Sequence, residues 1–217
     1  MSKLSEQFEI MFPQSVRTVL SSSIYLASQW SKELRNSLVS LPMRGSLLAG
    51  HAFPVFIDKI VASQIDKLEV GNFPYDYGEH RIPKCGYPYV EYHAPFGKFH
   101  IKKLERAEKL PKAAVHRLSN SMSNLIFLDF GDEYVPPNLG VPFGLVTYGH
   151  YKFDLTFMQV GFPSADYKGW IDSKRWNIAN DISKEMVEQI RQGATGQIKE
   201  EIQETILQKF TLKVKGE

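Results

Sequence analysis

The sequence contains a single cysteine, Cys85, among its 217 residues. One thiol excludes an internal disulfide framework and fits a reducing compartment. No stretch approaches the ~20 consecutive apolar residues that a membrane-spanning helix needs. The first residues, MSKLSEQFEI, also lack the apolar run of a signal peptide. We therefore expect a cytoplasmic protein that does not enter a membrane.

Charge of one sign and recognisable motifs are also scarce. The net charge is only +2 at pH 7, so any binding to nucleic acid or to an anionic membrane has to come from a local patch. Gly45 and Gly50 belong to no phosphate-binding loop, because the order strand, GxxxxGKS/T, helix is absent. What remains is an ordinary globular composition, with 43% apolar and 23% charged residues.

Helices are predicted at the N-terminal end of the chain. Apolar residues recur at three- and four-residue steps over residues 15–41, which indicates one long helix that ends at Pro42. A second helix is predicted over residues 54–68, with Gly71 as its terminator. The segment between them, residues 43–52, contains two glycines, and we expect it to form a bend.

A β-hairpin is predicted over residues 86–104, GYPYVEYHAPFGKFHIKKL, because apolar and polar residues alternate there. Pro95 and Gly97 favour a four-residue turn at 94–97. The resulting register places four pairs opposite each other: His93 and Lys98, Tyr92 and Phe99, Glu91 and His100, and Val90 and Ile101. One face is then wholly apolar, while the other carries Tyr89, Glu91, His93, Lys98, His100 and Lys102.

The rest of the chain predicts further strands and C-terminal helices. Residues 72–88 are expected to be irregular or to form a sheet edge, and part of 104–122 to be helical. The apolar run 124–130, NLIFLDF, predicts a strand buried on both faces. The later elements expected are a loop at 131–142, a hairpin with strands at 143–148 and 153–160, a loop at 163–176, and helices at 178–192 and 197–210.

Helices, then hairpins, then helices form an α+β pattern. We predict a small antiparallel sheet, built from two hairpins and the 124–130 strand and packed by N- and C-terminal helices. Its parts are an N-terminal helical part at 1–71, an antiparallel β core at 72–176 and C-terminal helices at 177–217, expected to form one globular unit. The last helix could dock on a second copy to make a homodimer, or fold back on its own sheet.

The polar face of the first hairpin is the candidate site. Glu91, His93 and His100 supply a carboxylate and two imidazoles, which is a ligand set for zinc or non-haem iron. Cross-strand neighbours lie close enough to converge on one ion. A solvated face with a ladder of charges explains the same pattern, so a divalent metal cofactor is one of two alternatives.

A nuclease is a second chemical hypothesis for this face. Some Mg²⁺-dependent nucleases hold the metal with carboxylates on neighbouring strands and steady the attacking water with a lysine. Glu91, His100 and Lys102 would be the catalytic residues here. Because a histidine stands where such enzymes have an acid, Asp129 or Asp154 would have to supply the missing carboxylate.

Basic residues gather after the first strand of the hairpin. Between Lys98 and Arg117 the sequence has seven Lys or Arg residues against two acids, which could contact phosphates or form a solubilising surface. Aromatic residues in irregular segments could bind a protein partner. The residues predicted to bind nucleic acid or another partner are Lys98, Lys102, Lys103, Arg106, Lys109, Lys112, Arg117, Tyr87, Tyr89 and Trp170. Cys85 is expected to be a structural or incidental thiol rather than a nucleophile.

Six short motifs between residues 86 and 170 resemble those of an uncharacterised family of bacterial and mobile-element proteins of unknown function. The motifs are GYPYVEYH, FHIKKL, LPKAAVHR, LVTYG, MQVGFP and YKGW. They are turns, strand ends and a tryptophan, so the resemblance carries over no catalytic residue. It implies a bacterial or phage setting.

Two functions remain open on the sequence alone. The first is an intracellular, non-enzymatic binding or regulatory protein that acts on a macromolecular partner, either protein or nucleic acid. The alternative is a metal-dependent hydrolase, such as a nuclease, that uses the polar face of the 86–104 hairpin. An enzyme would need those side chains to converge, whereas a binding protein needs only an exposed complementary surface.

Overall fold

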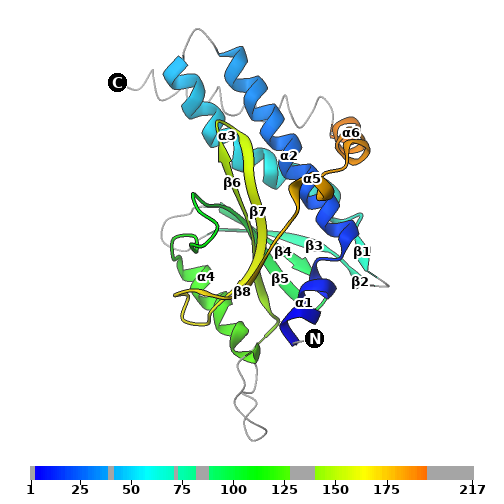
Figure 1. Ribbon diagram of the computed structural model, residues 1–217, viewed down its shortest axis with the longest axis vertical. Coiled ribbons are helices and arrows are strands. Elements are labelled where there is room, and N and C mark those ends of the chain that lie inside the picture. The colour runs from blue at the N-terminus through cyan, green and yellow to red at the C-terminus, as the bar shows by residue number, and fades with distance from the viewer. Residues whose placement is uncertain (1–2, 39–41, 71–72, 82–87, 128–139, 195–217) are drawn as a thin grey trace, which may run out of the picture.

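The computed structural model describes residues 3–38, 42–70, 73–81, 88–127 and 140–194. In these ranges, helices are layered on a six-stranded, mostly antiparallel sheet, which confirms the predicted α+β class (Figure 1). No helix in this part of the chain combines the length and apolar character needed to cross a membrane. The predicted helix at 197–210, through which a homodimer could form, lies outside the described residues.

Three helices open the fold. They are α1 at Lys3–Met11, α2 at Gln14–Ser37 and α3 at Pro42–Ile65. The prediction of a bend at residues 43–52 is wrong, because α3 runs through it. A glycine costs a helix only about 1 kcal/mol, and burial of Leu48, Ala52 and Phe53 outweighs that cost. Pro42 begins this helix rather than ending the previous one, since the first helical position needs no N–H donor.

α2 and α3 lie side by side and form the layer above the sheet. α2 buries several serines on its packed face, and small side chains let the two helices approach closely. Ser28 and Ser31 donate hydrogen bonds to carbonyls of their own helix, which satisfies their hydroxyl groups. Larger side chains also pack between α2 and α3: the rings of Trp30 and Phe56 meet edge to face, with 5.6 Å between their centroids.

The sheet has the strand order β3, β4, β5, β6, β7, β8. The bounds of these strands are Asp76–Arg81, Pro88–Ala94, Gly97–Lys103, Phe143–Tyr151, Asp154–Pro163 and Trp170–Arg175. A separate ladder pairs β1, Glu69–Val70, with β2, Phe73–Pro74. The sheet is mostly antiparallel, as predicted, but β5 and β6 are parallel neighbours. Residues 104–142 supply the long crossover that parallel neighbours require.

The first hairpin, β4 and β5, has the predicted register. Tyr92 pairs with Phe99 and His93 with Lys98, and both aromatic rings are fully buried against the helices. The positive φ of the turn falls at Phe96 (57°) rather than at Gly97. Gly97 serves a different purpose, since a Cβ there would collide with the side chain of Met11.

The second hairpin is longer than predicted. β6 continues to Tyr151, and the turn lies at Lys152 and Phe153, both with positive φ. Residues 170–175, predicted as loop, form strand β8 instead. β8 extends the sheet because its backbone pairs with that of β7, the strand before it in the chain. Its sequence, WIDSKR, lacks the regular apolar alternation that would predict a strand. The predicted edge character of residues 72–88 is confirmed for β3, which is the first strand of the sheet.

The crossover between β5 and β6 carries α4, Val115–Ser121, and the 3₁₀ helix η1, Met122–Phe127. The predicted strand at 124–130 is therefore wrong as far as residue 127, and 128–130 lie outside the described residues. Asn124 explains the helical turn, because its buried amide donates to the carbonyls of Phe143 (2.9 Å) and Pro163 (2.8 Å). It also accepts from the N–H of Phe143 at 2.8 Å. These bonds fix η1 to the ends of two strands.

The main core lies between the helices and one face of the sheet. It contains Tyr92 and Phe99 of the hairpin together with apolar residues of α1–α3. After the sheet, α5 at Ile178–Asp181 and α6 at Lys184–Gly193 pack beside α2. The predicted helix at 178–192 is thus confirmed as two helices with a short break. Figure 1 shows α4 far from α2 and α3, with the strands between them.

Candidate functional site

The polar face of the first hairpin is covered by α4. Because side chains alternate along a strand, Glu91 and His100 lie on the sheet face opposite Tyr92 and Phe99. His100 is fully buried, with 0% of its surface exposed. Its ring packs edge-on against Phe143 of β6, with 4.9 Å between ring centroids. The alternative of a solvated charge ladder is therefore wrong for His100, which belongs to the interior.

Glu91 is the centre of the polar groups on this face. Its carboxylate accepts a hydrogen bond from Asn120 of α4 at 2.6 Å and lies 3.3 Å from Nε2 of His100. Nε2 of His93 and Nζ of Lys98 lie 3.4 and 3.7 Å from its two oxygens. Lys98 also donates to the amide oxygen of Asn120 at 2.8 Å. We call these five residues, with His116 and Arg117 of α4, the Glu91 cluster.

The charges in the Glu91 cluster follow from its burial and hydrogen bonds. Burial alone would raise the pKa of Glu91, but the hydrogen bonds from His100 and Asn120 and the charge of Lys98 hold it at about 2. Burial lowers the pKa of His100 to about 4, against the opposing effect of Glu91. At neutral pH the pair is thus a carboxylate and a neutral imidazole. Nε2–H of His100 donates to Glu91, and Nδ1 carries a bare lone pair.

α4 adds a second imidazole beside His100. The ring centroids of His100 and His116 lie 5.3 Å apart. Nη1 of Arg117 lies 3.2 Å from Nε2 of His116, and a guanidinium can only donate. Burial, aided by the charge of Arg117, lowers the pKa of His116 to about 4. The neutral His116 ring therefore accepts at Nε2 and keeps its proton on Nδ1.

Tyr89 joins the two edges of this face. Its ring stacks on His116 at 4.1 Å between centroids and on His80 of β3 at 5.3 Å. The predicted binding residue Tyr89 is thus already engaged by two imidazoles of the same chain. A nucleobase would have to displace one of them in order to stack there.

Several buried polar atoms on this face lack a hydrogen-bond partner in the described part of the chain. They are Nδ1 of His100, Nδ1 of His116, Nε of Arg117, Oγ1 of Thr147 and Nε1 of Trp170. Burial raises the pKa of Tyr167, and the charge of Arg117 and a hydrogen bond with its side chain oppose that rise, which places this phenol beside the guanidinium. An unpaired buried polar group costs about 1–3 kcal/mol. The presence of several such atoms on one face therefore lowers the stability of the fold.

The predicted basic residues are distributed over three places rather than along one helix. By strand alternation Lys98 and Lys102 share the face of Glu91, while Lys103 projects to the opposite face and is exposed. The exposed residues of the segment between β5 and α4 are Arg106, Lys109 and Lys112. Trp170 of β8 packs against a small core of Phe143, Leu145 and Tyr167. Tyr87 and Cys85 lie outside the described residues.

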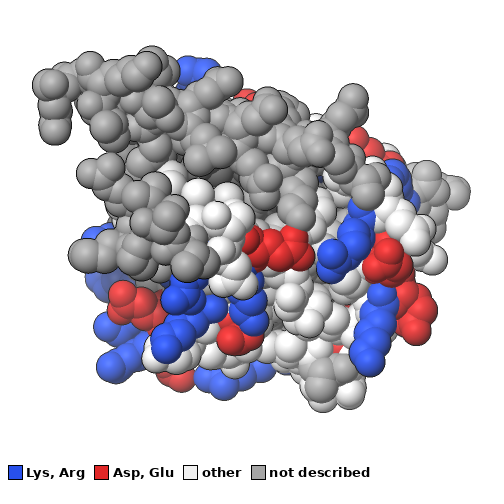
Figure 2. Space-filling model, turned by 90° about the horizontal axis from the view of Figure 1, so that it is seen from above, with Lys and Arg blue, Asp and Glu red and all other residues white. Residues whose placement is uncertain are grey.

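The surface charge is mixed in sign. In the view from above of Figure 2, Lys and Arg side chains lie among Asp and Glu side chains, and neither sign forms a continuous patch among the coloured residues. Glu108, for example, pairs with Arg175 at 3.2 Å. This face thus offers no broad electrostatic surface of the kind that tracks a nucleic-acid backbone.

A metal site finds no support in the described residues. There, no group of three or more His, Cys, Asp or Glu side chains is placed so that it could hold a metal ion. Of the two carboxylates that the nuclease hypothesis named, Asp154 pairs with Lys32 of α2, and Asp129 lies outside the described residues. Asp58, which is buried near Lys102, bonds to Tyr92 on the helix side of the sheet.

The outward face of α4 is apolar. Val115 and Leu118 of α4 and its C-cap residue Met122, at positions i, i+3 and i+7, have 76%, 39% and 52% of their surface exposed. His116 and Asn120, at i+1 and i+5, point the other way into the Glu91 cluster. α4 is therefore amphipathic in an unusual sense, because His116 and Asn120 are half-buried while the apolar side chains opposite them are in solvent.

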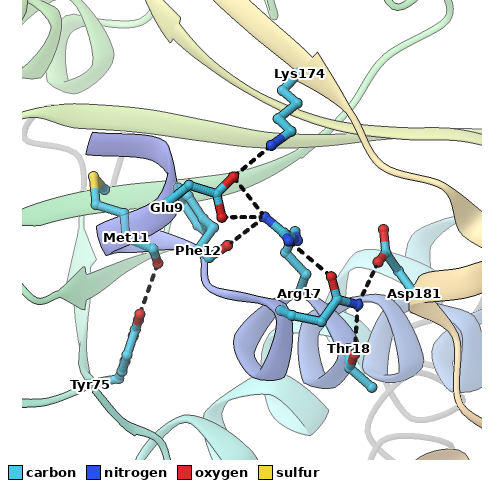
Figure 3. A network of polar contacts seen from close by, with 9 residues as sticks. Glu9, Met11, Phe12, Arg17, Thr18, Tyr75, Lys174 and Asp181 are labelled. Carbon is cyan, nitrogen blue, oxygen red and sulfur yellow. Dashed lines mark hydrogen bonds and ion pairs between the residues drawn. The ribbon is translucent and has the colours of Figure 1, made fainter. Parts of the chain in front are cut away.

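A second polar group serves as a contrast. Figure 3 shows Arg17 of α2 bonded to Glu9 (3.2 Å), to the carbonyl of Phe12 (3.0 Å) and to Gln14 (2.9 Å). The remaining bonds of this Glu9 network join Lys174 to Glu9 and Gln14 to Asp181 and Thr18. Each polar group drawn has a partner, and the network ties α1, α2, β8 and α5 together. We assign it a structural role.

Two residues of the site were missed at the sequence level as members of it. Neither Asn120 nor His116 belongs to a catalytic or metal-binding motif. Their signal is the i, i+4 spacing of two polar residues on one side of a helix whose other side is apolar. No protein-family model, curated protein or solved structure matches this chain.

Proposed function

We propose that the protein is a binding protein and that α4 docks an acidic, amphipathic segment of a protein partner. The observation that carries the proposal is the apolar stripe of Val115, Leu118 and Met122, exposed by 76%, 39% and 52%. Three large apolar side chains at helical spacing form the kind of surface into which another amphipathic segment packs.

Charge supports an acidic occupant. Arg106, Lys109 and Lys112 precede the stripe, are exposed, and form no ion pair with the described residues. Acidic side chains of a partner would supply their missing counter-charges, and the attraction would speed association and set the orientation of the segment. A second copy of this chain would bring the same three cations, Arg106, Lys109 and Lys112, against its partner's, which disfavours self-association at this surface.

The same observations favour a protein over nucleic acid. An apolar stripe has no use against phosphates, and the ring of Tyr89 is already stacked. The alternative of a metal-dependent hydrolase would require a set of metal ligands that the described residues do not assemble.

Site-specific photo-crosslinking tests the proposal. A photoreactive amino acid at the position of Leu118, introduced in the source cells, should form an adduct with a peptide that has net negative charge and apolar residues at helical spacing. The matched control places the same group at Tyr151, which is 66% exposed on the β6–β7 turn. The control position should not form this adduct.

Charge reversal sharpens the same experiment. The double variant Lys109→Glu, Lys112→Glu should reduce the yield of the adduct by about tenfold or more, whereas Lys152→Glu, Lys184→Glu, with the same change in net charge at exposed positions elsewhere, should not. Adducts with nucleic acid, adducts with another copy of this chain, or a yield that ignores both reversals would each contradict the proposal.

A further inference from the structure

We propose that the Glu91 cluster and the neighbouring Tyr167 form a binding site for a hydrogen phosphate group, either free phosphate or a small phosphomonoester. This site is separate from the apolar stripe of α4 and does not depend on partner docking. Its basis is the set of buried donor and acceptor atoms on this face that have no hydrogen-bond partner among the described residues.

The first step is the identity of the unpaired atoms. Nδ1 of the fully buried His100 is an acceptor, because its other nitrogen donates to Glu91 at 3.3 Å. Nδ1 of His116 is a donor, because Arg117 occupies the other nitrogen at 3.2 Å. Nε of Arg117 is a third unpaired atom and can only donate. The site thus presents one buried acceptor and at least two buried donors.

The second step is charge. With both imidazoles neutral, Lys98, Lys102 and Arg117 carry three positive charges against one negative charge on Glu91, a balance of +2. Counting Asp58, which acts on Lys102 from the helix side of the sheet, leaves +1. A group that enters here should therefore be an anion.

The third step selects the anion. A ligand for this site has to donate one O–H to His100 and accept from His116 and Arg117. Free hydrogen phosphate does both at neutral pH, since it keeps one O–H and also has free oxygens. A phosphate monoester keeps its proton only up to a pKa of about 6, so it meets the same requirement in mildly acidic solution. Sulfate and carboxylate lack the proton in this range. Tetrahedral oxygens also match the planar guanidinium of Arg117, and His93, with 46% of its side chain exposed, borders the site toward solvent.

Tyr167 completes the set and provides the sharpest variant. Its hydroxyl is buried beside Arg117, whose charge and side-chain hydrogen bond oppose the rise that burial causes in the pKa of the phenol, so Tyr167→Phe removes a hydroxyl next to the guanidinium and keeps the ring. The matched control is Tyr151→Phe, which removes a phenol hydroxyl from an exposed turn. Both variants should fold as the parent does.

The experiment is a thermal-shift and calorimetric titration at pH 6.5 with sodium phosphate, glycerol phosphate and sodium sulfate at matched ionic strength. Phosphate should raise the melting temperature in a concentration-dependent manner, and sulfate should not. Tyr167→Phe and Arg117→Met should each weaken phosphate binding by about fivefold or more, and Tyr151→Phe should leave it unchanged. Binding of glycerol phosphate would identify a monoester ligand, and binding of phosphate alone would identify free phosphate.

Two results would overturn the proposal. One is an equal response to phosphate and sulfate, which would show a general effect of anions. The other is phosphate binding that survives in both Tyr167→Phe and Arg117→Met. Neither variant changes Val115, Leu118 or Met122. A negative result for phosphate binding therefore does not bear on partner docking at α4, which the photo-crosslinking experiment tests independently.

Discussion

The Glu9 network and the Glu91 cluster both use a carboxylate to join helices to the same sheet. In the Glu9 network, Arg17 and Lys174 saturate a half-exposed carboxylate, and each polar group drawn in Figure 3 has a partner. In the Glu91 cluster the carboxylate is also well bonded, yet the imidazoles and the guanidinium around it leave buried atoms unpaired. The hydrogen bonds of the Glu9 network stabilise the fold, whereas the unpaired buried atoms of the Glu91 cluster destabilise it.

The difference teaches what unpaired burial indicates. A paired network at the junction of α1, α2 and β8 is explained by stability alone. A group of unpaired donors and acceptors under α4 lowers stability, so another role has to account for it. That contrast, rather than the presence of histidines, is the reason to assign the ligand site to the Glu91 cluster.

The largest expected effect comes from Glu91→Gln. The change removes the charge that accepts from His100 and Asn120 and neutralises Lys98. We expect the free energy of unfolding to fall by about 2–3 kcal/mol, as for other hydrogen bonds to a buried charge. Urea denaturation at pH 7 measures it. Glu79→Gln, on the exposed edge strand β3, is the control and should change stability by less than about 0.5 kcal/mol.

Glu91→Gln should also change how the free energy of unfolding depends on pH. The folded pKa of Glu91, about 2, is below the ordinary value of 4.5. Its contribution to stability is therefore complete above about pH 4.5 and is lost as the pH falls toward 2. The pH dependence of stability in this window should be shallower in Glu91→Gln than in the parent. An unchanged slope would show that Glu91 is not held ionised by the cluster.

A smaller loss is expected from Arg17→Met in the Glu9 network. Methionine keeps the apolar stem of the side chain and removes the bonds to Glu9, Gln14 and the carbonyl of Phe12. We expect a loss of about 1–2 kcal/mol in urea denaturation, because the network is partly open to water. Arg35→Met in the same helix is the control. A loss no larger than that of the control would remove the structural role of the network.

The smallest effect should have the opposite sign. Thr147→Val replaces a fully buried hydroxyl that has no partner with a methyl group of the same shape, so stability should stay the same or rise by up to about 1 kcal/mol. Thr18→Val, which removes an acceptor of Gln14 in the Glu9 network, should be neutral or slightly destabilising. A clear loss of stability in Thr147→Val would mean that its hydroxyl is in fact paired.

Short-range sequence patterns correctly predicted the first hairpin. Alternation fixed the register of Tyr92 opposite Phe99, since a slip by one residue would expose both rings. The short apolar run at 124–130 was misassigned because periodicity over so few residues does not separate a strand from a helical turn. The parallel pairing of β5 with β6 depends on contacts between distant segments that no local pattern records. β8 follows β7 after a short loop, but its sequence, WIDSKR, lacks the regular apolar alternation that would predict a strand.

The candidate site was predicted in part. Glu91, His93 and His100 do come together, because the hairpin register places them on one face. Their chemistry was not predictable, since it depends on α4: Asn120 bonds to Glu91, and Arg117 fixes the proton of His116. The burial of His100 likewise follows from the crossover that covers the face, and a hairpin considered alone cannot show it.

The most direct test of this account is the protonation of His100. Long-range ¹H–¹⁵N correlation spectra of the imidazole rings, assigned with His100→Gln, report which nitrogen carries a proton at each pH. We predict a neutral His100 with its proton on Nε2 and a bare Nδ1 from pH 8 down to about pH 5, as its pKa of about 4 requires. A ring protonated on both nitrogens at pH 7, or a neutral ring with its proton on Nδ1, would contradict the unpaired acceptor on which the account depends.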